Sequence, residues 1–78
     1  MSEEQEILLA LGKRIDQLRK QKGMSFQTLA NMSDFEKSNL VKLVSRGSNV
    51  TVSTLIRISD ALEVNLHELF FFETDSER

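Results

Sequence analysis

The sequence contains no cysteine and no proline, and it has a single histidine, His67. Without cysteine there can be no disulfide and no thiolate metal site, and one histidine is too few for a catalytic metal cluster. Proline is the strongest helix breaker, while good helix formers such as Leu, Glu, Lys, Gln and Arg are plentiful. The composition therefore favours an all-α domain that holds no metal, and it suits a reducing, cytoplasmic location.

The motifs of common enzymes are also missing. No serine has a histidine and an acid at a catalytic spacing, there is no glycine-rich phosphate loop, and the acids form no recognisable metal pattern. We therefore expect neither an enzyme nor a cofactor.

Residues 2–6 are polar and acidic, whereas a secretory signal would begin with positive charge followed by a long apolar run. The sequence thus predicts no export and no membrane span.

The length of 78 residues leaves room for one small domain and no second core. We predict a single domain over residues 1–78, with its core in residues 7–72 approximately. The acidic residues 73–78 have no apolar side chain to anchor them and are expected to be frayed. A domain of this size has no evident surplus for a pocket, so we expect no small-molecule effector.

The net charge of −2 hides an uneven distribution of charge. Residues 1–12 contain three acids and no base, and residues 58–78 contain six acids and one base. Between them, residues 13–57 contain nine bases and three acids, a local charge of +6. Charges act over only about 10 Å in ordinary salt, so the local excess matters more than the total. The middle of the chain could attract phosphates, although a solvated helix face would have the same composition.

The first helix is predicted to begin near Ser2 or Glu3 and to end at Gly23, a residue suited to the left-handed conformation that ends helices. Acids at its start and bases at its end agree with the helix dipole. Its apolar residues recur at helical spacing and predict a core-facing stripe formed by Ile7, Leu8, Leu11, Ile15 and Leu18. The pattern leaves open whether the two turns before Leu11 extend beyond the compact domain.

Residues 23–47 predict two short helices separated by a tight turn. Ser25 can cap a first helix of about two turns, and Ser33 and Asp34 form the turn. A second helix follows from Phe35 or Glu36 to Ser45, with an apolar inner face and a polar outer face. This pattern is typical of the helix-turn-helix, which presents side chains to a groove of DNA.

Two more helices are predicted after a polar loop. Thr51 can cap a helix from Val52 to Leu62, whose inward residues are Leu55, Ile58, Ser59 and Leu62. Asn65 and Glu68 have the spacing of a capping box for a last short helix, from Leu66 to about Phe72.

These residues resemble the Cro and phage-repressor (Xre-like) helix-turn-helix family, including small controller-type regulators. The match runs without a gap from Leu11 to Phe70, and it includes the segments Leu11-Gly12-Lys13-Arg14-Ile15, Lys22-Gly23-Met24-Ser25, Asn49-Val50-Thr51-Val52 and Ala61-Leu62-Glu63-Val64-Asn65-Leu66. The resemblance implies a compact five-helix, lambda-repressor-like domain that binds double-stranded DNA as a homodimer, with its third helix in the major groove.

Carried over by position, the base-reading residues would be Lys37, Ser38, Val41 and Lys42. Contacts with the DNA backbone would come from Phe26 or Gln27 and from Asn39, Arg46, Ser48 and Asn49. The chemistry agrees, because lysine can donate to guanine, serine can serve several bases and valine can touch a thymine methyl group. Simple solvent exposure is the alternative for each of these side chains.

The chain departs from the family pattern at four positions, all inside residues 23–47. Phe26 stands in place of a DNA-contacting glutamine, and Asp34 replaces a turn glycine. Val44 replaces a glutamate that commonly pairs with the arginine matched here by Arg19, so we expect Arg19 to be free for a phosphate or for solvent. Gly47 lies one place later than the family glycine, so the loop after the third helix could be rebuilt.

The leading hypothesis is a transcriptional regulator, a controller of a restriction-modification operon or a phage-type repressor, which binds a short palindromic operator as a homodimer. The proposed dimer interface consists of Leu66, Leu69, Phe71 and Phe72, because adjacent aromatic residues on a small surface usually have a partner. Alternatively, these rings fold over the open end of the core. A protein-interaction module of the same fold, such as an antitoxin or anti-repressor, is the alternative function.

Overall fold

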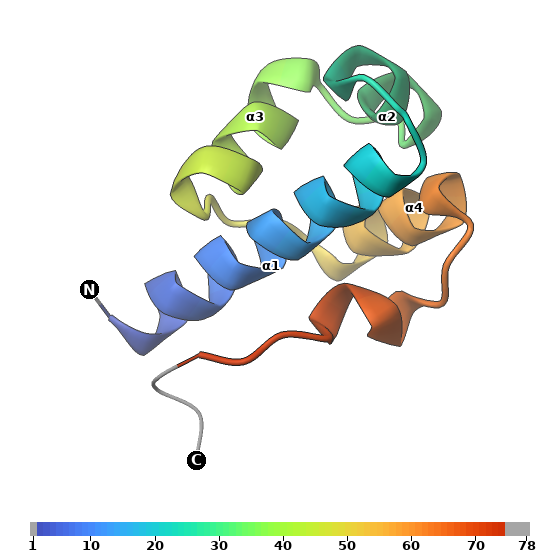
Figure 1. The fold of residues 1–78 in the computed structure, drawn as a ribbon. Helices are drawn as coiled ribbons and strands as arrows, with labels where there is room; N and C mark the ends of the chain where they lie inside the picture. The colour runs from blue at the N-terminus through green and yellow to red at the C-terminus, as the bar shows by residue number, and fades with distance from the viewer. Residues whose placement is uncertain (1, 75–78) are drawn as a thin grey trace.

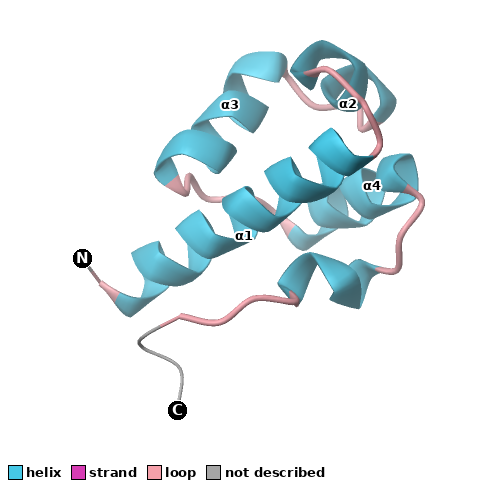
Figure 2. Ribbon diagram, in the orientation of Figure 1, coloured by secondary structure: helices cyan, strands magenta, loops and turns pink. Residues whose placement is uncertain are grey.

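The computed structural model describes residues 2–74, which fold into four α-helices followed by one 3-10 helix (Figures 1 and 2). The elements are α1 (Glu3–Gln21), α2 (Phe26–Met32), α3 (Lys37–Arg46), α4 (Val52–Leu62) and η1 (Leu66–Phe70). The described residues contain no strand, so the predicted all-α class is confirmed. The count of five α-helices is wrong, because the last element is a 3-10 helix. The predicted frayed tail, residues 73–78, lies mostly outside the described residues.

Local capping explains where three of the four α-helices begin, and only α3 starts without a side-chain cap. The hydroxyl oxygens of Ser2, Ser25 and Thr51 each accept a backbone N–H from the residue three positions later, at 3.1, 3.0 and 3.2 Å. Each bond satisfies one of the N–H groups that a helix start leaves without a partner. At η1 the capping box of Asn65 and Glu68 is also present, as predicted.

The core lies between α1 and the other helices, with α2 and α3 on one side of α1 and η1 on the other (Figure 1). The predicted apolar stripe of α1 is buried at Leu11, Ile15 and Leu18. All four predicted inward residues of α4 are also buried. Every helix and η1 contributes to one continuous apolar cluster, which consists of Leu11, Ile15, Leu18, Leu29, Ala30, Leu40, Leu43, Leu55, Ile58, Ala61, Leu62 and Leu69.

Two glycines allow the backbones of α1 and α3 to touch. A Cβ atom placed on Gly12 would lie 2.1 Å from the carbonyl oxygen of Leu43, and one on Gly47 would lie 2.6 Å from the backbone nitrogen of Leu9. Neither distance is possible for a real side chain, so both positions require glycine while the helices keep this separation. The second contact also shows that the turns before Leu11 pack against the end of α3 and do not extend beyond the domain.

Arg19 joins the end of α1 to the start of α2. Its guanidinium donates to the Asp16 carboxylate at 3.0 and 2.8 Å and to the carbonyl oxygen of Met24 at 2.7 Å. The guanidinium also lies over the ring of Phe26, 4.1 Å from its centroid. The expectation that Arg19 is free was therefore wrong: with Val44 unable to accept a hydrogen bond, Arg19 takes its partners from α1 and the following turn.

Two further arginines hold parts of the chain that are distant in sequence. Arg14 donates to the carbonyl oxygen of Glu68 at 2.9 Å, which ties η1 to α1. Arg57 donates to the carbonyl oxygen of Ser33 at 2.8 Å, which ties the turn after α2 to α4. Three of the nine bases in residues 13–57 are thus used to stabilise the fold.

Gly12→Ala should lower the free energy of unfolding by about 1–3 kcal/mol, measured by urea denaturation. Alanine normally stabilises a helix relative to glycine, but the added methyl group would meet the backbone of Leu43. Gln21→Ala, at an exposed position of the same helix, is the control and should change stability by less than about 0.5 kcal/mol. Equal stability of both variants would show that α1 and α3 can separate without cost.

Asp16→Asn should lose more stability at neutral pH than in acid. Partial burial by itself raises the pKa of the Asp16 carboxyl, but hydrogen bonds and charge from Arg19 and Lys20 outweigh burial and lower the pKa. A lowered pKa in the folded state contributes stability above the ordinary carboxyl value of about 4, and this contribution disappears as the pH falls through the folded-state value. The free energies of unfolding of wild type and Asp16→Asn, measured from about pH 7 to about pH 2, should converge as the pH falls. A difference that stays constant over this range would contradict the prediction.

Candidate nucleic-acid interface

The turn between α2 and α3 is held by backbone geometry and by the core. The N–H of Phe35 donates to the carbonyl oxygen of Ala30 at 3.0 Å, and the Phe35 ring packs against the core. Asp34 takes the left-handed conformation, with φ of 50°, as its place in the family turn predicted. Ser33 is fully buried, and its carbonyl oxygen is bound by Arg57. The angle between α2 and α3 is therefore set by contacts with the rest of the domain.

The predicted base-reading residues lie on one exposed face of α3. Leu40 and Leu43 face the core and are almost completely buried. Residues at positions i, i+1, i+4 and i+5 of a helix share a face, and the structure leaves all four such side chains exposed: Lys37, Ser38, Val41 and Lys42. Val41 has 36% of its surface exposed, so an apolar contact is available among the polar side chains.

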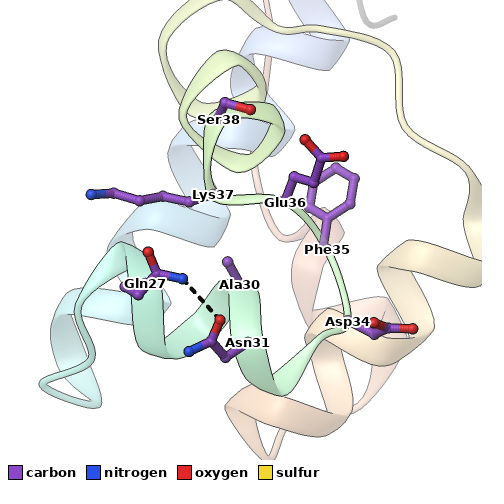
Figure 3. Close-up of a pocket in the computed structure, with 8 residues that line it drawn as sticks. All are labelled: Gln27, Ala30, Asn31, Asp34, Phe35, Glu36, Lys37 and Ser38. Atoms are coloured by element: carbon purple, nitrogen blue, oxygen red, sulfur yellow. Dashed lines mark hydrogen bonds between the residues drawn. The ribbon is translucent and has the colours of Figure 1, made fainter.

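A shallow groove separates α2 from the start of α3 (Figure 3). Its lining residues are Gln27, Ala30, Asn31, Asp34, Phe35, Glu36, Lys37 and Ser38. The Gln27 side-chain amide donates to the Asn31 side chain at 2.8 Å. Lys37 extends toward the side of Gln27, whereas Asp34 and Glu36 lie on the other side of the groove (Figure 3). The groove thus has a basic edge next to α2 and an acidic edge at the turn.

The residues predicted to contact the DNA backbone surround this face. Gln27, Asn39, Arg46 and Asn49 are exposed and Ser48 is half-buried. The structure brings Arg46, Ser48 and Asn49 together at the end of α3, and Gln27 lies at the groove. Phe26 is half-buried beneath Arg19, so its ring has a structural partner.

The end of α3 has a regular geometry although its glycine is displaced. Gly47 adopts the left-handed conformation, with φ of 68°, and its N–H donates to the carbonyl oxygen of Leu43 at 3.1 Å. Left-handed glycine is a common helix end. Because α3 continues through Arg46, this side chain stays on the helix.

Positive charge is available on α3. Within residues 2–74, the side chains of Lys37, Lys42 and Arg46 form no ion pair, whereas Arg19, Lys20 and Lys22 do. The segment Lys37–Arg46 contains three bases and no acid. Three unpaired cations on one exposed helix can attract an anionic surface without first breaking a contact within the domain.

The predicted dimer residues do not share one surface. Leu69 is fully buried in the core and Leu66 is half-buried, so the placement of Leu69 at an interface was wrong for this fold. A 3-10 helix repeats every three residues, which directs both leucines toward the core. Phe72 is half-buried and packs against the core, while Phe70 and Phe71 remain 44% and 61% exposed. Sequence reasoning did not include Phe70 in the interface.

The rest of the described surface offers no metal cluster. Among residues 2–74 no group of three or more His, Asp or Glu side chains could hold a metal ion. None of the helices in this part of the chain is long and apolar enough to cross a membrane. His67 is exposed, and its ring lies 5.5 Å from that of Phe71.

Solved structures with this fold include two controllers and a regulator bound to DNA. The restriction-modification controller protein C.AhdI from Aeromonas hydrophila is 32% identical, with a TM-score of 0.78 over 81% of this chain and 96% of that chain. The master regulator for biofilm formation SinR, in complex with DNA, is 35% identical, with a TM-score of 0.72 over 76% and 95%. A point mutant of the restriction-modification controller protein C.Esp1396I is 26% identical, with a TM-score of 0.76 over 82% and 83%.

No curated protein sequence matches the chain significantly. The family model of the Cro/C1-type HTH DNA-binding domain matches residues 14–75, which include α2, α3, α4 and η1. This confirms the resemblance to the Cro and phage-repressor family. The chain therefore belongs to the family of Cro/C1-type helix-turn-helix DNA-binding domains, whose members are DNA-binding transcription regulators.

Proposed function

We propose that this DNA-binding regulator acts as a homodimer on a short palindromic operator, with α3 in the major groove. The observation that carries the proposal is the exposed face of α3, which has two unpaired lysines, one hydroxyl group and one exposed valine, with a third unpaired base, Arg46, at the end of the helix. A major groove is about 12 Å wide and admits one helix, and its base edges offer acceptors and thymine methyl groups to such side chains.

Base reading is assigned to four residues of this face. Lys37 and Lys42 are free to donate to guanine O6 and N7, and Ser38 can donate to or accept from several bases. Val41 supplies an apolar contact for a thymine methyl group.

Phosphate contacts are assigned to the residues around that face: Gln27, Asn39, Arg46, Ser48 and Asn49. Arg46 has the longest reach and a full charge, so it is the strongest candidate among them. Contacts of this kind orient a protein on the duplex and supply most of its salt-dependent affinity.

Dimerisation follows from the need for specificity. One small module reads few base pairs, and a two-fold dimer doubles the contacts at half-sites roughly 34 Å apart. The exposed rings of Phe70 and Phe71, together with the half-buried Leu66 of η1, form the best candidate interface on the described surface. We therefore replace Leu69 with Phe70 in the proposed interface and assign Phe72 a role at its edge.

A role as controller of a restriction-modification operon is supported by two of the similar solved structures. C.AhdI and C.Esp1396I are restriction-modification controllers, and C.AhdI is matched over almost its full length. A phage-type repressor would have the same small domain, and a repressing role suits both.

One observation favours a second function. Asp34 and Glu36 are exposed beside the base-reading face, and carboxylates near the DNA backbone would repel phosphates. An antitoxin or anti-repressor that binds a basic protein surface would use such acids directly. We prefer DNA because α3 itself contains three bases and no acid.

DNA binding should weaken steeply with salt, and the lysines of α3 should contribute to it. We expect fluorescence anisotropy with random duplex to show binding at low salt, and the logarithm of the association constant should fall with the logarithm of the salt concentration with a slope of about −0.9 for each phosphate contact.

In selection from a random DNA pool, Lys37→Ala or Lys42→Ala should weaken the preference for one base at one operator position by about 1–3 kcal/mol.

Lys22→Ala is the matched control, because Lys22 is exposed after the end of α1 and its ammonium lies 3.7 Å from the Glu63 carboxylate, outside both proposed surfaces. It should leave base preference unchanged. No binding of wild-type protein to duplex at low salt would overturn the DNA proposal in favour of the protein-binding alternative. If Lys37→Ala or Lys42→Ala loses affinity equally for all DNA sequences, the substituted lysine contacts a phosphate and does not read a base.

Phe70→Ser combined with Phe71→Ser should convert dimers to monomers in sedimentation velocity, because the change removes the two most exposed rings of the proposed interface. Met32→Ser replaces a side chain on α2 that is 56% exposed and should leave the oligomeric state unchanged. Dimers that persist in the double variant would refute this choice of surface.

A further inference from the structure

The first eleven residues of α1 lie outside the family match. The matched region begins at residue 14, whereas α1 begins at Glu3. This segment, residues 3–13, is nevertheless part of the folded unit, since Leu11 is buried and Ile7, Leu8 and Leu9 are half-buried. These first turns of α1, about three in number, therefore fold with the matched domain, and they have a defined packing partner.

That partner is the end of α3. The side-chain amide of Gln5 donates to the backbone carbonyl oxygen of Arg46, and the same nitrogen lies 3.5 Å from the carbonyl oxygen of Gly47. Carbonyl groups at the end of a helix have no partner within the helix. Gln5 thus supplies, from a helix about forty residues earlier in the chain, a donor for the last turn of α3.

The hydrogen bond lies where the two backbones touch. Gly47 is buried against Leu9, with no room for a Cβ atom. The end of α3 is therefore confined on one side by the backbone of α1 and is joined to it by the Gln5 amide. Arg46 and the following residues 48 and 49, assigned above to DNA phosphates, take their position from this confined point.

We propose that Gln5 is a positioning residue for DNA binding: the first turns of α1 hold the end of α3 and the loop after it in the geometry that contacts phosphates. The proposal rests on the proposed DNA-binding function of α3. The proposed role is indirect, because the Gln5 amide is directed at the carbonyl oxygens of Arg46 and Gly47.

The test compares Gln5→Met with Gln21→Met on the selected operator duplex. Methionine keeps the length and helix propensity of glutamine but cannot donate to the carbonyl groups. We expect Gln5→Met to lose about threefold to tenfold in affinity. Its log–log salt slope should also become shallower by about 1, since a phosphate contact loses its position. Gln21 is exposed at the far end of the same helix, so its variant should match wild type in both measurements.

Two further measurements separate positioning from general stability. Amide NMR shifts of residues 46–49 should move in free Gln5→Met, while the midpoint of thermal unfolding stays close to that of wild type. Gln5→Glu, which faces the two carbonyl groups with an acceptor, should lose more affinity than Gln5→Met.

Wild-type affinity and salt slope in Gln5→Met would overturn the proposal, as would an affinity loss that follows a loss of stability with an unchanged slope. If wild-type protein itself does not bind duplex, the proposed function has failed instead.

Discussion

The direct backbone contact between α1 and α3 is the constraint on which the rest of the structure depends. Gly12 and Gly47 bring the two helices together at two levels, at distances that exclude any other residue. With α3 held this closely, Leu40 and Leu43 enter the core and the opposite face of α3 is exposed. The exposed face of α3, proposed above to bind DNA, is therefore a consequence of how closely α3 packs, because the same rotation that buries the leucines exposes Lys37 and Lys42.

The division of the basic residues into two groups explains how an acidic chain can belong to a DNA-binding family. Arg14, Arg19 and Arg57 donate to backbone carbonyl oxygens and tie together elements that are distant in sequence. A guanidinium suits this task because it offers several donors in a fixed plane. The three bases of α3 form no ion pair within residues 2–74, and the helix contains no acid, so their charge is available to an anionic partner.

The departures from the family pattern are compensated nearby. Val44 cannot accept a hydrogen bond from Arg19, and Phe26 cannot donate one to a phosphate. In the structure Arg19 compensates for both changes, because its guanidinium stacks on the Phe26 ring and forms an ion pair with Asp16. The start of α2 is thus fixed by a local cluster instead of a pair between α1 and α3.

The sequence by itself determined the all-α class, the family and the starts of the three capped α-helices, because caps such as Ser25 and Thr51 act within three residues and apolar spacing marks the inner faces. Only the tertiary structure decided the partners of Arg19 and Gln5, the burial of Leu69 and the exposure of Phe70. These features depend on how helices are rotated against one another and on a last element that is 3-10 instead of α. Local spacing predicts neither feature, because groups about forty residues apart, such as the Gln5 side chain and the backbone carbonyl group of Arg46, meet only after the chain has folded.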